Sequence, residues 1–135
     1  MEIQQLLQLT VDRKASDLHL IAGLPPTLRI EGALFAIPGE APRAPEEIEK
    51  DIRAVVSSEQ AEHYSVNKEL DLSVSFSNLA RFRVNLYHQK DAPAVSFRYI
   101  PTEIPTIDSL NLPPIIHYFT ELRQGFVLIT GPTGH

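Results

Sequence analysis

The sequence contains neither cysteine nor tryptophan and carries a single methionine. Without cysteine, the chain can form neither a disulfide framework nor a zinc-finger site. No stretch approaches the ~20 consecutive apolar residues that a membrane-spanning helix needs. The acidic Glu2 stands where a signal peptide carries lysine or arginine, which argues against export. We therefore expect a cytoplasmic protein whose fold depends on an ordinary hydrophobic core.

What the sequence does contain is typical of a small globular domain. Its 135 residues, 43% hydrophobic and 21% charged, suffice for one domain with its own core. The net charge of −5 argues against nucleic acid as a partner, since such binding depends on neutralising phosphates. One segment is nevertheless basic and predicts a local site for an anion. It holds Arg81, Arg83, Lys90 and Arg98 against Asp91 alone.

The first part of the chain predicts helices and strands from the spacing of its apolar residues. A proline followed by two acids marks one helix start, because proline suits the first helical position and acids suit the positive end of the helix dipole. Ser57 and Gln60 have the spacing of a capping box at another helix start. The expected elements are a helix at residues 3–11, strands at 16–21 and 27–31, a short apolar piece at 33–37, and helices beginning at Pro45 and Ser57.

The middle of the chain is dominated by strict two-residue alternation. Apolar side chains occupy every second position of three runs, residues 69–76, 80–88 and 94–99. Such alternation is typical of an antiparallel sheet with one packed face and one face open to solvent. We predict an α+β domain that ends near residue 100, in which helices cover one face of a mainly antiparallel sheet.

The last part of the chain has a different composition. Four prolines fall within residues 100–114, which predicts a semi-rigid interdomain linker at 101–113 with at most one helical turn. A helix at 114–122 and a continuously apolar strand at 126–130 are expected after it. An apolar run of this kind is typical of a strand buried on both faces of a parallel sheet. Residues 114–135 therefore predict the start of a second domain.

The apolar run leads into a turn that has the form of half a phosphate-binding loop. The complete loop is G-x-x-x-x-G-K-[ST], whose glycines let backbone N–H groups surround a phosphate. The second glycine, the lysine and the Ser/Thr are absent, so a plain Gly-Pro turn after a strand is the alternative. The candidate nucleotide-binding positions here are Gly131, Pro132, Thr133, Gly134 and His135.

The last two strands of the antiparallel sheet are expected to form a hairpin. Its register follows from placing apolar side chains opposite one another, since a slip of one residue would turn a whole face over. Pairing Val84 with Phe97 satisfies this condition. On the other face, the same register places Arg83 opposite Arg98. A register shifted by two residues is the alternative, and it would also keep both arginines on that face as neighbours.

Two arginines in that position predict a bound anion. Like charges directly opposite each other are destabilising, and the planar guanidinium group matches the geometry of a phosphate. We predict that Arg83 and Arg98 contact a nucleotide phosphate. The alternative is a solvated pair, or ion pairs with Glu69 or Asp71 on the neighbouring strand.

Asp17 and His19 share the outward face of their strand and raise the question of a metal or a proton relay. Two ligands of mixed type without a third nearby make a weak metal signal. No nucleophilic serine or cysteine motif accompanies them. We predict a structural hydrogen-bonded pair and no metal site.

Six stretches, taken in order, resemble the secretion ATPases of type II secretion and type IV pili, above all those of the pilus-retraction type. The resemblance covers nearly the whole chain. The stretches are A-S-D-L-H-L (15–20), P-P-T-L-R-I-E-G (25–32), R-F-R-V-N (81–85), S-F-R-Y-I-P (96–101), I-P-T-I-D-S-L-N-L-P (104–113) and G-F-V-L-I-T-G-P-T-G (125–134).

The resemblance implies a PAS-like N-terminal domain, followed by the first helix and strand of a RecA-like ATPase core. It implies a hexameric ring that uses ATP and Mg²⁺ to drive pilus retraction from the cytoplasmic side of the inner membrane. The implied partners are ATP, further copies of the chain and the inner-membrane platform protein of the pilus. In that family, arginines of the N-terminal domain reach the nucleotide phosphates, and the matching positions are Arg83 and Arg98.

The sequence departs from the family pattern in two respects. His135 stands where the family usually shows serine, at a position that mainly contributes backbone. The loop lysine and all later motifs lie outside these 135 residues, so no catalytic residue is assigned and this chain alone is expected to be inactive.

Two further functions stay open. One is a pilus-extension or type II secretion ATPase; those relatives carry an extra domain before this one, and the start of this chain at its first helix favours retraction. The other is a free-standing PAS-like module that binds a ligand or a protein.

Overall fold

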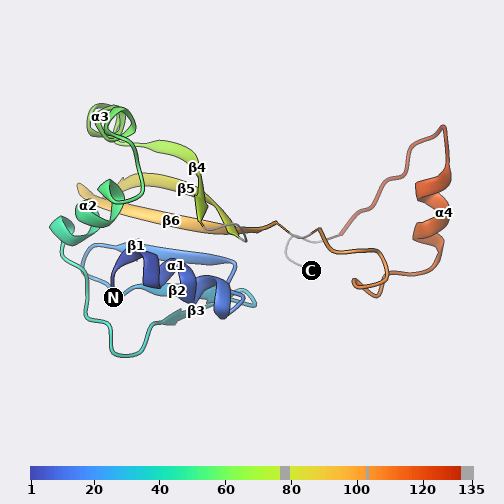
Figure 1. Ribbon diagram of the computed structural model, residues 1–135, viewed down its shortest axis with the longest axis horizontal. Helices are drawn as coiled ribbons and strands as arrows, with labels where there is room; N and C mark the ends of the chain where they lie inside the picture. The colour runs from blue at the N-terminus through green and yellow to red at the C-terminus, as the bar shows by residue number, and fades with distance from the viewer. Residues whose placement is uncertain (77–79, 103, 132–135) are drawn as a thin grey trace. The chain divides into compact units, whose positions relative to one another are not determined.

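The computed structural model describes residues 1–76, 80–102 and 104–131, and Figure 1 shows it as a ribbon. It divides into two compact units, Met1–Thr102 and Glu103–His135. Within the described ranges, no helix is long and apolar enough to cross a membrane.

The first unit is an α+β domain built on a six-stranded antiparallel sheet, as the alternating patterns predict. The strand order is β3-β2-β1-β6-β5-β4, so the N-terminal strands and the C-terminal hairpin meet where β1 pairs with β6. The strands are β1 (Asp17–Ile21), β2 (Thr27–Ile30), β3 (Ala33–Ala36), β4 (Leu70–Phe76), β5 (Ala80–Gln89) and β6 (Ala92–Pro101).

Three helices cover the apolar face of this sheet. They are α1 (Ile3–Asp12), α2 (Pro45–Arg53) and α3 (Ser58–Asn67). Helix α1 packs against β1, α2 against β6 and α3 against β4 (Figure 1). Buried apolar side chains of the helices and strands form one core cluster. At its centre Phe82 meets Phe97 edge to face, with ring centroids 6.4 Å apart.

The helix starts lie where the sequence signals predict them. Pro45 is the first residue of α2, with two acids in its first turn. Ser57 caps α3 by accepting a hydrogen bond from the backbone N–H of Gln60, and the Gln60 side chain accepts one from the backbone N–H of Ser57. The capping-box prediction is therefore confirmed.

The hairpin of β5 and β6 has the register that the apolar pattern predicts. Val84 is paired with Phe97, and Arg83 with Arg98. Its turn residues Lys90 and Asp91 both adopt positive φ angles, 51° and 61°, which is the backbone of the tight turns that match the twist of paired strands.

The second unit holds the predicted helix as α4 (Ile115–Glu121). The strand expected at residues 126–130 is absent from the structure. Its apolar side chains are exposed, Phe126 by 86% and Ile129 by 80%. A strand of a parallel sheet exists only beside other strands, and the described part of this unit contains none. The continuously apolar composition therefore does not produce a strand here.

Candidate functional site

The open face of the sheet carries two cross-strand rows of polar side chains. They arise because successive residues of a strand point to opposite faces, so every second residue of each strand lies away from the helices. Following the strand pairing from β2 to β4, the first row is Arg29, Asp17, Arg98, Arg83 and Ser73. The neighbouring row is Thr27, His19, Ser96, Asn85 and Asp71.

Asp17 is the anchor of the first row. The residue is only 4% exposed, and its carboxylate accepts two hydrogen bonds and forms an ion pair with a second guanidinium. Oδ1 accepts a hydrogen bond from Nε of Arg98 at 3.0 Å. Oδ2 accepts one from Oγ of Ser16 at 2.8 Å and lies 3.5 Å from Nε of Arg29. A buried carboxylate is tolerated when it is paired and hydrogen-bonded in this way.

These contacts keep Asp17 ionised. Burial by itself would raise its pKa, but the hydrogen bonds from Ser16 and Arg98, together with the charge of Arg98, outweigh burial and lower the pKa below the ordinary 3.8. The Arg98 side chain, by contrast, remains 68% exposed. A fixed negative charge therefore lies beneath a solvent-facing guanidinium.

Arg83 lies beside Arg98 but is held more loosely. Its Nη2 is 3.8 Å from Oδ2 of Asp71, and both side chains are largely exposed, by 66% and 58%. Asp71 also accepts a hydrogen bond at 3.2 Å from the side-chain amide of Asn85. Exposed ion pairs of this length contribute little to stability. The alternative that pairs Arg83 with Asp71 is thus realised, as a weak contact.

A hollow of about 300 Å³ lies over this part of the sheet. Its lining combines two guanidinium groups, an amide and a hydroxyl, which can all donate hydrogen bonds, with one carboxylate on the β4 side. Such a set suits an anion with several oxygen atoms. The lining residues are Asp71, Arg83, Asn85, Ser96 and Arg98.

His19 does not form the predicted hydrogen bond with Asp17. The carboxylate is already satisfied by Ser16, Arg29 and Arg98, and Nε2 of His19 is buried with no hydrogen-bond partner among the described residues. Burial holds its pKa below the ordinary 6.5, against the smaller opposing effect of Asp17. The described ranges contain no group of three His, Cys, Asp or Glu side chains placed to hold a metal ion.

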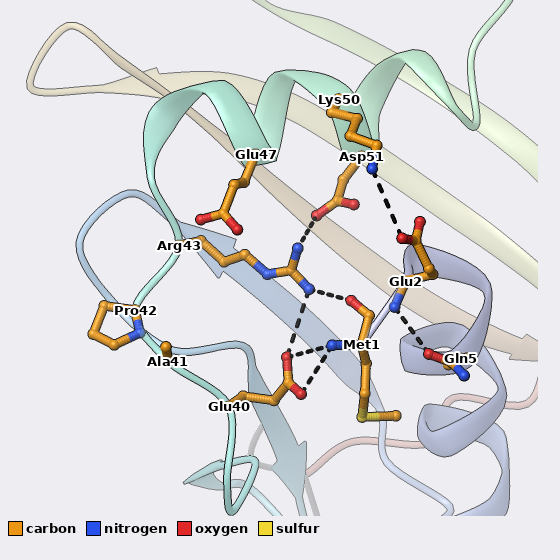
Figure 2. Close-up of a pocket in the computed structure, with 10 residues that line it drawn as sticks. All are labelled: Met1, Glu2, Gln5, Glu40, Ala41, Pro42, Arg43, Glu47, Lys50 and Asp51. Atoms are coloured by element: carbon orange, nitrogen blue, oxygen red, sulfur yellow. Dashed lines mark hydrogen bonds and ion pairs between the residues drawn. The ribbon is translucent and has the colours of Figure 1, made fainter.

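A second hollow, of about 520 Å³, lies beside the N-terminus and has a different chemistry. Figure 2 shows Arg43 reaching between α2 and the N-terminus. Its guanidinium lies 3.2 Å from Asp51 and 3.6 Å from Glu40, and donates to the carbonyl of Met1. Burial raises the pKa of Asp51, against the opposing charge of Arg43. Because Arg43 is engaged on both sides, this hollow is a poor anion site.

The candidate residues fall on different units. Arg83 and Arg98 belong to the first unit and are neighbours across the hairpin. Gly131 belongs to the second unit and is exposed. The remaining loop positions, Pro132, Thr133, Gly134 and His135, lie outside the described residues.

Sequence reasoning missed the partner of Arg98. The hairpin pattern identifies Arg83 and Arg98, but the Asp17–Arg98 contact joins residues 81 positions apart and depends on β1 pairing with β6. Hydrophobic alternation fixes which face a residue occupies and leaves open which strands are neighbours. The one available signal is that Asp17 stands at an outward position of its strand.

No family model matches the chain. Two curated relatives come from Pseudomonas aeruginosa: the type IV pilus retraction ATPase PilT, 34% identical over 134 residues, and the type IV pilus ATPase PilU, 31% identical over 134 residues. Each alignment covers 99% of this chain, whereas the chain spans only 39% of the PilT length and 35% of the PilU length.

A solved structure agrees with these relatives. A crystal structure of the pilus retraction motor PilT with bound ADP is 30% identical to this chain, with a TM-score of 0.78. The match covers 99% of this chain and 39% of that one. From end to end, the chain is therefore related to the N-terminal part of the PilT and PilU ATPases of type IV pili.

Proposed function

We propose that this chain is the N-terminal part of an ATP-hydrolysing motor that drives type IV pilus retraction, and that Arg83 and Arg98 contact the phosphates of the nucleotide. One observation carries the proposal. Two largely exposed arginines are paired across a hairpin and line a hollow rich in hydrogen-bond donors. The relationship to PilT, and the ADP in the PilT structure, support a nucleotide as the anion.

The charge balance of the site favours an anion. Arg98 is offset by Asp17, and the loose contact with Asp71 leaves most of the Arg83 charge uncompensated. A phosphate group between the two guanidinium groups would relieve their repulsion and gain charge-assisted hydrogen bonds. Asn85 and Ser96 would supply further donors from the adjacent row.

The wider architecture is part of the same proposal. The first unit is the PAS-like domain of the motor, and residues 114–135 begin a RecA-like core that binds Mg-ATP. Six copies form a ring on the cytoplasmic side of the inner membrane, where it meets the platform protein of the pilus. Retraction is favoured because PilT, one of the curated relatives, is a retraction ATPase, and type II secretion is disfavoured because PilT and PilU are ATPases of type IV pili.

The test is ATP turnover in a full-length protein that carries this segment and a complete ATPase domain. Arg83→Ala and Arg98→Ala should each lower kcat/KM about 10- to 100-fold, the loss expected for a hydrogen bond to a charged group. Arg81→Ala is the matched control, because Arg81 is an exposed arginine of the same strand and face that does not line the hollow. Turnover that is unchanged in both site variants would contradict the assignment.

The 135-residue chain itself should show no ATP turnover. The loop lysine and the hydroxyl that binds Mg²⁺ are not among its residues. This expectation would be refuted if the purified chain hydrolysed ATP and the activity eluted together with the chain through successive columns.

A further inference from the structure

We propose that Asp17 is a positioning residue for the anion site: it holds Arg98 through Nε alone and so presents the Nη1 and Nη2 groups to the ligand. This inference rests on the proposed function of Arg83 and Arg98 and adds a residue and a mechanism to it. It also makes a distinction between the two aspartates of the open face, Asp17 and Asp71.

The geometry around Arg98 is one-sided. Nε donates to Oδ1 of Asp17 at 3.0 Å. Among the described residues, Nη1 and Nη2 of Arg98 have no hydrogen-bond or ion-pair partner within the domain. The side chain is 68% exposed although the carboxylate beneath it is only 5% exposed. Arg98 is thus anchored at its inner edge and free at its outer edge.

Anchoring changes what a ligand has to pay in entropy. A free arginine side chain loses rotamer freedom when it binds an anion, whereas an arginine already held by a buried acid has lost much of it on folding. Asp17 is well suited to be that acid, because Ser16 and Arg29 hold it from its other oxygen. The anchor is therefore rigid as well as charged.

Asp71 has the opposite relationship to the site. It is exposed, belongs to the edge strand β4, and approaches Arg83 at Nη2, the part of the guanidinium that an anion would use. Its carboxylate also accepts a hydrogen bond from the side-chain amide of Asn85, a donor that an anion would otherwise use. Asp71 therefore competes with a bound anion, while Asp17 supports it.

The same chemical change at the two aspartates separates these roles. Asp17→Asn and Asp71→Asn each remove one negative charge from the same face, so charge alone predicts that both strengthen anion binding. Positioning predicts opposite signs. Asp17→Asn should weaken binding by about threefold or more, in the range of coupling between contacting residues. Asp71→Asn should strengthen it by up to about fivefold, the scale of an exposed ion pair.

The measurement is an NMR titration of the isotope-labelled 135-residue chain with inorganic triphosphate. Chemical-shift changes give the Kd, and the amide spectrum reports whether each variant is folded. In the double variant with both Asp17→Asn and Arg98→Ala, binding should be no weaker than in Arg98→Ala alone, because Asp17 acts through Arg98. Tighter binding in Asp17→Asn, or equal weakening with and without Arg98, would overturn the positioning role.

A second measurement uses the chain without any substitution, so it does not require that a variant folds. With triphosphate bound, the Nε–H of Arg98 should exchange with water no faster than in the free chain, because Asp17 continues to hold it. Faster Nε–H exchange on binding would mean that the anion takes Arg98 away from Asp17, and the proposal would be wrong.

The outcomes distinguish the two levels of the argument. If Arg98→Ala weakens triphosphate binding and Asp17→Asn does not, the proposed function stands and the positioning role fails. If the unchanged chain shows no triphosphate binding, or Arg98→Ala leaves the Kd unchanged, the positioning role is overturned, and ATP turnover of the full-length arginine variants decides the proposed function.

Discussion

The two faces of the six-stranded sheet are made by alternate residues of the same strands, yet they are organised by different forces. On the helix face, Phe82 and Phe97 are completely buried and meet edge to face. On the open face, the adjacent residues Arg83 and Arg98 are mostly exposed and repel each other. Burial of apolar area stabilises the first face, about 25 cal/mol for each Å² removed from water. Apart from the buried Asp17, the second face is arranged around exposed charges that contribute little to folding.

The helix face should show the largest loss of stability. Phe82→Ala removes a fully buried ring at the centre of the core, and we expect it to lower the free energy of unfolding by about 3–5 kcal/mol. Urea denaturation followed by circular dichroism measures this. The control is Leu34→Ala in β3, where the side chain is 55% exposed, with an expected change within about 0.5 kcal/mol. Similar losses of stability in the two variants would contradict the conclusion that apolar burial stabilises the helix face.

Asp17 is the exception on the open face, because it is buried there. Asp17→Ala removes the acceptor of Ser16 and the counter-charge of Arg29 and Arg98. We expect a loss of about 1–3 kcal/mol in the free energy of unfolding, the scale of a buried hydrogen-bonding group left without its partner. Asp71→Ala, at an exposed pair, should cost less than about 1 kcal/mol. If both aspartates had the same small effect, burial would not be what distinguishes them.

His19 should make the stability of the domain depend on pH. Burial, with a contribution from Arg29 and Arg98, keeps its folded-state pKa below 6.5 despite the opposing charge of Asp17. As the pH falls, the unfolded chain therefore binds the proton at a higher pH than the folded chain does. The contribution of His19 to stability is fully present above pH 6.5 and decreases as the pH falls below it. In His19→Gln, the denaturation midpoint should depend less on pH below 6.5 than it does in the unchanged chain.

Asp17 adds a second decrease at lower pH. Its folded-state pKa lies below 3.8, so its contribution is present above that value and is lost as the pH falls through the folded-state pKa. The decrease from His19 begins below pH 6.5, whereas the decrease from Asp17 begins only below pH 3.8. If the stability of the domain decreased only below pH 3.8, the predicted contribution of His19 would be wrong.

The smallest effect on folding should come from a residue central to the proposed function. Arg83→Ala removes an exposed side chain with one long ion pair, and the free energy of unfolding should change by no more than about 0.5 kcal/mol. Triphosphate binding, measured on the same sample, should nevertheless be clearly weakened. A variant that lost stability and kept its binding would reverse the contrast between the two faces.

Much of this fold follows from patterns in the sequence. Alternation in residues 69–99 predicts three strands and their inward faces. Pairing Val84 with Phe97 is one of the registers that keep apolar side chains together, and it is the one that the structure adopts. Pro45 and the Ser57–Gln60 pair mark helix starts through local chemistry. Local rules succeed here because the groups involved are close in sequence.

The rest depends on contacts between distant segments. No local pattern indicates that β1 lies between β2 and β6, or that Asp17 reaches Arg98. His19 was expected to bond Asp17, and the acid instead bonds residues of β1's neighbours. At the C-terminal end, the apolar residues 126–130 have the composition of a buried strand, and composition cannot supply the neighbouring strands that such a strand requires.

The pairing of β1 with β6 also determines when the proposed site comes into existence during folding. The Arg83–Arg98 hairpin closes a short loop and can form early, whereas Asp17 meets Arg98 only after a loop of 81 residues has closed. On the ribosome, β1 stays without this partner until β6 has been synthesised. A partly folded chain can therefore present both arginines, but it lacks the acid that holds one of them in place. Completion of the sheet and completion of the site are then one and the same event.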